Sequence, residues 1–107
     1  MRGVIFGTTL ERANKMFDHL VEDYKLVQIN PVKIIKTKNG SQVYFENGDA
    51  WKTASNSSHC CGTRCNIAYI DRKFDELTIQ EIIRPAITCK PFQGERYFDL
   101  WEEDEAQ

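Results

Sequence analysis

The chain has 107 residues, of which 41% are hydrophobic and 28% are charged, and its formal net charge is −2. These values are typical of one globular domain and argue against a disordered chain. The apolar runs are too short for a transmembrane helix or for the core of a signal peptide, so we expect a cytoplasmic protein that does not bind membranes.

Negative charge is concentrated at one end of the chain. Four of the 16 acidic side chains stand at positions 102–105, which leaves 14 basic and 12 acidic side chains, a net charge of +2, in the rest of the sequence. We therefore predict one domain over residues 1–101, followed by an acidic and frayed tail over 102–107.

A strand and a helix are predicted at the start of the chain. Residues 3–8 (GVIFGT) have the pattern of a short buried strand. Thr8 and Glu11 have the spacing of a capping box, with Thr8 as the N-cap of the helix. Apolar residues up to Tyr24 then recur at the helical spacing, and charged residues, Arg12 among them, fill the opposite face.

An antiparallel meander of three strands is predicted over residues 32–55. Two Asn-Gly pairs, Asn39-Gly40 and Asn47-Gly48, separate its β-rich runs. Such pairs favour type I′ hairpin turns, which need positive φ at both central residues.

The second half of the chain is predicted to complete an α/β domain. Residues 65–71 (CNIAYID) are typical of a central strand that is apolar on both faces. A helix capped by Asp75 or Thr78 runs to Pro85, and residues 88–101 close the core as a strand or a short helix. We therefore expect one α/β domain, with a mixed sheet in which the first strand and the 66–71 strand are parallel, and with two helices packed on it.

Asp71 is the first candidate for a functional residue. It stands at the carboxyl end of a buried strand, where open α/β sheets place their ligands. A carboxylate there holds Mg²⁺ in nucleotide hydrolases. The plainer alternative is an Asp that starts a turn.

A cluster of thiols and one imidazole is the second candidate. Zinc takes four Cys or His ligands in tetrahedral geometry, and this cluster could supply them from His59, Cys61, Cys65 and Cys89. The two-pair spacing of a zinc ribbon is missing, however. The alternative is a loop of small residues whose thiols are reduced, as is usual in a cytosol.

Basic side chains on the meander and the following loop form the third candidate. They could contact nucleic acid or a protein partner, and the residues selected for this role are Lys52, His59, Arg64 and Arg72. Lysines on strands also protect a sheet edge from aggregation, so both interpretations stay open.

No phosphate-binding G-x-x-x-x-G-K-[ST] motif occurs in the sequence. We therefore expect neither nucleotide hydrolysis nor a bound cofactor.

Taken in order, these segments resemble the ATPase core of phage terminase large subunits. The resemblance covers about residues 3–87. It is carried by the A-x-x-x-F helix face at 13–17, the hairpin at 43–49, the loop at 55–66 with Gly62 and Arg64, the strand at 67–71 and the helix at 78–85.

The resemblance implies a P-loop-NTPase-like core in which Asp71 matches the metal-binding Asp of the Walker B strand. Arg72 stands where the family has its catalytic Glu. The family's phosphate loop precedes the matching segment and its nuclease domain follows it, and this sequence contains neither.

We therefore expect a phage or prophage protein that acts without catalysis, by binding DNA or a phage or host protein. Two alternatives remain: one half of a split NTPase completed in trans, in which Asp71 would hold Mg²⁺, and a small zinc-binding module.

Overall fold

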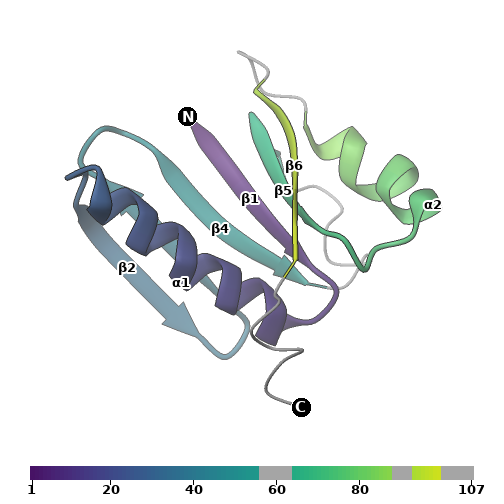
Figure 1. The fold of residues 1–107 in the computed structure, drawn as a ribbon, viewed down its shortest axis with the longest axis horizontal. Coiled ribbons are helices and arrows are strands. Elements are labelled where there is room, and N and C mark those ends of the chain that lie inside the picture. Colours follow the sequence, from purple (N-terminus) through teal and green to yellow (C-terminus); the bar gives the residue numbers. More distant parts are fainter. Residues whose placement is uncertain (56–63, 88–92, 100–107) are drawn as a thin grey trace.

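Six strands form one mixed sheet in the computed structural model, which describes residues 1–55, 64–87 and 93–99 (Figure 1). The elements in chain order are β1 (Arg2–Gly7), α1 (Leu10–Leu26), β2 (Pro31–Thr37), β3 (Gly40–Phe45), β4 (Ala50–Ser55), β5 (Ile67–Asp71), α2 (Glu76–Thr78), η2 (Ile79–Ile83), η3 (Arg84–Ala86) and β6 (Gly94–Phe98). The strand order is β2-β3-β4-β1-β5-β6. The predicted α/β class with a mixed sheet is confirmed.

The sheet has an antiparallel half and a parallel half. Strands β2, β3 and β4 form the predicted meander, while β1 pairs in parallel with both β4 and β5. Strand β6 adds a further parallel pair at the edge beside β5. The expectations for the meander and for the parallel pairing of the first strand with the Asp71 strand are both confirmed. Residues 88–101 supply an edge strand rather than a helix within their described part.

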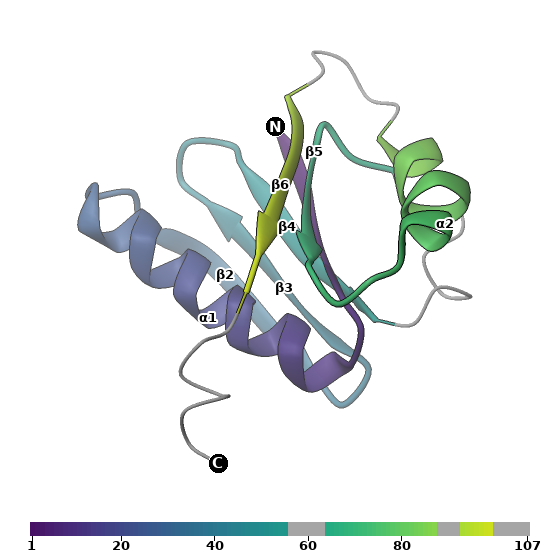
Figure 2. The ribbon, with the colours of Figure 1, turned by 45° about the vertical axis from the view of Figure 1, so that its right-hand side comes forward.

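Two helical segments cover opposite faces of this sheet (Figure 2). Helix α1 packs against β1, β3 and β4, and the cluster beneath it is built around Phe17, Val43 and Trp51. The segment from α2 to η3 packs through Ile79 and Ile83 on apolar residues of β1 and β5. This second cluster contains no buried residue of β2 or β3. Among the described residues, a helical segment therefore covers the meander on one face and not on the other.

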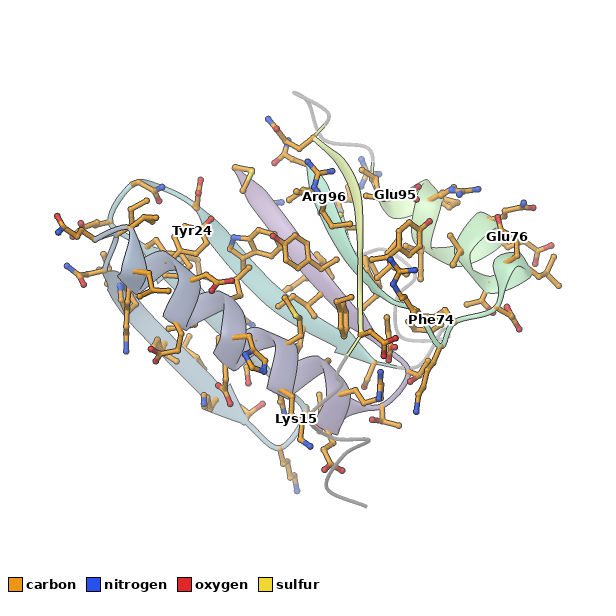
Figure 3. The ribbon with its side chains drawn as sticks, viewed as in Figure 1. Lys15, Tyr24, Phe74, Glu76, Glu95 and Arg96 are labelled. Atoms are coloured by element: carbon orange, nitrogen blue, oxygen red, sulfur yellow. The ribbon has the colours of Figure 1, made fainter. Side chains whose placement is uncertain are left out.

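Strand β4 contacts β1 through a large side chain that packs on a residue without a side chain. The indole of Trp51 lies over Gly3, where an added Cβ would come within 2.4 Å of the ring. The indole N–H donates to the Tyr24 hydroxyl at 3.0 Å, and that hydroxyl donates to Asp49 at 2.7 Å. Tyr24 lies near the C-terminal end of α1 (Figure 3). This chain of contacts holds that end of the helix to the sheet.

The helix begins one residue later than predicted. Thr9, not Thr8, is the N-cap: its side chain accepts from the Arg12 N–H at 3.2 Å. The prediction of Thr8 as the cap is wrong, because the Thr8 hydroxyl forms a hydrogen bond with a residue outside the helix. Gly7 makes the tight passage possible, since a Cβ there would lie 2.7 Å from the backbone nitrogen of Ala13.

The two predicted hairpin turns are in place, but they are not of type I′. A type I′ turn would need positive φ at Asn39 and Asn47, but Gln28 is the one non-glycine residue with positive φ in the described ranges. In the second turn the Gly48 N–H donates to the Phe45 carbonyl at 3.0 Å, and Gly48 itself has a φ of 94°. In this turn only the glycine adopts positive φ, so the asparagine does not need to adopt that less favourable conformation.

The second helical segment is irregular. Asp75 caps it, accepting from the Thr78 N–H at 2.7 Å, so the first of the two predicted caps is correct. The regular helix predicted up to Pro85 is replaced by three short pieces, in which η2 is a π-helix and η3 a 3₁₀-helix. Pro85 lacks an N–H, so the α-helical hydrogen bonds cannot continue through it. Arg84 holds the segment to β6 by a 2.8 Å hydrogen bond from its Nε to Oε1 of Glu95.

Within the described ranges, no helix combines the length and the apolar character needed to cross a membrane. The predicted acidic tail at 102–107 lies outside the described residues.

The C-terminus of α1 generates a stability prediction. Gln28 has a φ of 64°, and the bonds from the Ile29 N–H to the Tyr24 carbonyl and from the Gln28 N–H to the Lys25 carbonyl form a Schellman motif. A side chain in this conformation costs about 1 kcal/mol. We expect Gln28→Gly to raise the free energy of unfolding by about 0.5 kcal/mol or more in urea denaturation. The control Gln28→Ala keeps a Cβ and should not raise the free energy of unfolding. Equal free energies of unfolding for the two variants would contradict the prediction.

Candidate functional site

Asp71 lies fully buried at the carboxyl end of β5, beside the end of β1. Its Oδ2 accepts from the Thr8 backbone N–H at 3.1 Å and from the Thr8 hydroxyl at 2.8 Å. Its Oδ1 accepts from the Lys73 N–H at 3.0 Å. The carboxylate therefore closes the turn that follows β5 and joins it to the turn that follows β1.

The guanidinium of Arg12 completes this arrangement from α1. Its Nε lies 2.7 Å from Oδ2 of Asp71 and its Nη2 lies 3.0 Å from Oδ1, a bidentate pair. Asp99, just after β6, lies 3.9 Å from the same Nη2. Arg12 is only 4% exposed. Its predicted place on the solvent-exposed polar side of the helix is wrong, because its guanidinium pairs with a buried carboxylate that is distant in sequence.

These contacts set the charge state of the site. Burial by itself raises the pKa of the Asp71 carboxyl. Hydrogen bonds from Arg12, from the Lys73 N–H and from Thr8 outweigh that effect and lower the pKa to about 2. Asp71 is thus an anion at neutral pH, neutralised by a cation that the chain itself provides.

The two oxygens of Asp71 accept the five hydrogen bonds described above, four of them from Thr8 and Arg12. A carboxylate has about four lone-pair sites, so its capacity is taken up. The Mg²⁺-binding role of Asp71 stays a prediction. As built, the arrangement is an ion pair that joins α1 to β5.

A second region of interest lies on the face of the meander that α1 does not cover. Because side chains alternate along a strand and pair across strands, the registers place several exposed or half-buried residues together there. This surface, named the open face, consists of Arg2, Lys33, Gln42, Tyr44, Ala50, Lys52 and the adjoining Arg64.

Two hollows of about 290 and 370 Å³ lie side by side on the sheet, and Gln42 and Lys52 line both. The larger hollow is also lined by Arg2 and Arg64. Among the residues that the structure describes, no carboxylate lines either hollow. In the part of the chain that the structure describes, Arg2, Lys52 and Arg64 form no ion pair. Their positive charges are therefore not neutralised by any described carboxylate.

The structure brings two of the predicted partner-binding residues together and separates a third. Lys52 and Arg64 line the same hollow. Arg72 lies at the turn after β5, where its side chain is exposed and its N–H donates to the Phe98 carbonyl. His59 lies outside the described residues.

The predicted zinc ligands are only partly placed. Cys65 is buried in the apolar cluster under the second helical segment. His59, Cys61 and Cys89 lie outside the described residues. Within the described ranges, no three His, Cys, Asp or Glu side chains are grouped as metal ligands.

Arg2 and Tyr44 are not among the residues predicted from the sequence. A signal for Tyr44 was present in the alternation of β3, whose residues are buried and exposed in turn. With Val43 and Phe45 facing the core, the side chain between them must face outward. Arg2 reaches the open face only through the parallel pairing of Arg2 with Ala50, which no local pattern encodes.

Neither a protein-family model nor a curated protein sequence matches this chain. Among solved structures, it is similar to the large terminase of a thermophilic bacteriophage in complex with ADP, with a TM-score of 0.60 and 13% sequence identity. The similarity covers 91% of this chain and 25% of the terminase chain. It shows a terminase-like fold, and this chain spans about a quarter of the length of that protein.

The buried ion pair leads to a prediction on stability. Arg12→Leu leaves the Asp71 carboxylate buried without its cation, so we expect a loss of about 3–5 kcal/mol in the free energy of unfolding near pH 7, measured with urea. Lys15→Ala is the matched control. Lys15 stands on the same helix, and its ion pair with Glu11, 3.9 Å long, is exposed, so its loss should change stability by less than about 0.5 kcal/mol.

The same pair sets a dependence on pH. The carboxyl of Asp71 has a pKa of about 2 when folded and 3.8 ordinarily, so its stabilising effect is complete above about pH 4 and is lost as the pH falls toward 2. The protein should lose about 2 kcal/mol in this interval through Asp71. Arg12→Leu should therefore approach the parent protein in stability near pH 2.5. A gap between them as wide as at neutral pH would refute this assignment.

Proposed function

We propose that this chain is a terminase-like domain that binds DNA on its open face and does not hydrolyse nucleotide. The observation that carries the proposal is the group of Arg2, Lys52 and Arg64 around a hollow that none of the described carboxylates lines. Proteins that bind nucleic acid place unpaired Lys and Arg side chains where phosphates can reach them.

The distribution of charge favours DNA over a protein partner. On the side of the sheet that α1 covers, three lysines are paired with carboxylates of α1: Lys15 with Glu11, Lys25 with Glu22, and Lys36 of β2 with Asp18. The described cations of the open face have no such partner. A phosphate backbone supplies the missing negative charge at regular intervals, whereas a protein partner would need a matching acidic surface.

The contacts of Asp71 support the proposal of a non-catalytic domain. A Walker B carboxylate must have an oxygen free for the water shell of Mg²⁺, whereas here Arg12, Thr8 and the Lys73 N–H occupy both oxygens. Arg72, the next residue, is a cation and cannot activate a water molecule as a base. The solved terminase is in complex with ADP. For the present chain we propose that nucleotide binding is not retained.

DNA binding is tested with a pair of charge variants. Lys52→Ala with Arg64→Ala should weaken binding to duplex DNA at least about fivefold in about 50 mM salt, and the slope of log K against log salt should become shallower by about 2. Fluorescence anisotropy with a labelled duplex measures both quantities.

The matched control for this experiment is Lys15→Ala with Lys25→Ala, which removes the same charge from α1, on the covered side of the sheet. It should bind DNA as the parent protein does. Equal weakening by the two double variants would mean that only net charge matters, and it would overturn the assignment to the open face.

The absence of catalysis is tested by titrating the protein with Mg-ATP in a calorimeter. We expect no heat of binding, because the Asp71 carboxylate is neutralised internally. Binding that is lost on Asp71→Asn would overturn this part of the proposal and would favour the split-NTPase alternative.

A further inference from the structure

The open face carries an aromatic side chain among its cations. We propose that this face takes single-stranded nucleic acid, with Tyr44 stacking on a base and with Arg2, Lys33 and Lys52 contacting phosphates. The inference rests on the proposed function and narrows its ligand class.

Sheet register aligns these residues in a row across four strands. Lys33 on β2 is paired with Tyr44 on β3, Tyr44 with Ala50 on β4, and Ala50 with Arg2 on β1. Neighbouring strands lie about 4.8 Å apart. Lys33 is therefore one strand spacing from Tyr44 on one side, and Arg2 is two strand spacings from it on the other side. Lys52 follows on the next row of the same face, two residues after Ala50.

Tyr44 is held in a way that leaves its ring accessible. It is 44% exposed, and its hydroxyl donates to Oε1 of Gln42 at 3.3 Å. Its partner across the sheet, Ala50, is too small to cover the ring. The hollow of about 370 Å³ beside it is within the size range of small-ligand pockets and is lined by Arg2, Lys52 and Arg64.

Stacking distinguishes single strands from duplexes. In a duplex the base faces are already stacked, and a side chain on a flat sheet surface meets only phosphates and sugars. An unpaired strand can turn a base onto an aromatic ring while its phosphates stay on neighbouring cations, which is the general way in which sheet surfaces bind single strands. Tyr44 should therefore contribute to single-strand binding and very little to duplex binding.

The test compares fluorescein-labelled twelve-nucleotide oligothymidine, its RNA counterpart oligouridine, and a twelve-base-pair duplex by anisotropy. We expect Tyr44→Ala to weaken binding of the single strands about tenfold, the loss of one stacked base, and to change duplex binding less than about twofold. Tyr44→Phe should bind as the parent protein does, because it keeps the ring. A loss on both single strands, or on one of them, supports the proposal and shows whether the sugar is read.

Tyr97 offers a matched control. It is 40% exposed on β6, away from the open face, so Tyr97→Ala should leave single-strand binding unchanged. Urea denaturation of each variant shows whether it is folded. Single-strand binding by Tyr44→Ala equal to that by Tyr97→Ala, or a Tyr44→Phe variant as weak as Tyr44→Ala, overturns the stacking proposal.

The two proposals fail in different ways. If the Lys52 and Arg64 variants weaken binding while Tyr44→Ala does not, DNA binding stands and the single-strand inference fails. If the parent protein binds neither the single strands nor the duplex, both fail.

Discussion

The ion pair between Arg12 and Asp71 is the interaction on which the arrangement of the parallel half of the fold depends. It joins the first turn of α1 to the end of β5, and through Thr8 it also holds the end of β1. Both partners are almost completely buried. A buried pair adds little over a well-packed apolar contact, but the loss of one partner leaves an unpaired charge in the core. The pair therefore favours this one arrangement of helix and sheet over others.

Its position has a consequence for function. The carboxyl ends of parallel strands are where open α/β sheets place ligands, and in this chain that place is taken by a guanidinium. The carboxylate that resembles a Walker B residue is thereby satisfied within the protein. Within the described residues, cations without an ion-pair partner lie elsewhere, on the open face, where Lys52 and Arg64 line one hollow. For this reason the binding that we propose is at the sheet surface rather than at the strand ends.

This surface is open because the two helical segments differ in reach. Helix α1 is 17 residues long and packs on β1, β3 and β4. The α2–η3 segment on the opposite face is short and irregular, and its apolar residues contact β1 and β5. The meander is thus covered on one side and exposed on the other within the described residues, which is why β3 alternates between buried and exposed side chains.

Local patterns in the sequence determined the elements and their order: the strand and helix up to Tyr24, the three strands of the meander, the buried strand ending at Asp71 and a helical segment capped by Asp75 or Thr78. These features depend on periodicity, turn residues and caps, which are encoded within a few neighbouring positions. Only the tertiary structure decided that Arg12 is buried, that Thr9 rather than Thr8 caps the helix, and that Arg2 joins Tyr44 and Lys52. Arg12 and Asp71 are 59 residues apart, and Arg2 meets Ala50 only through a parallel pairing. Contacts of this kind depend on how strands are ordered in the sheet, and no local pattern specifies that order.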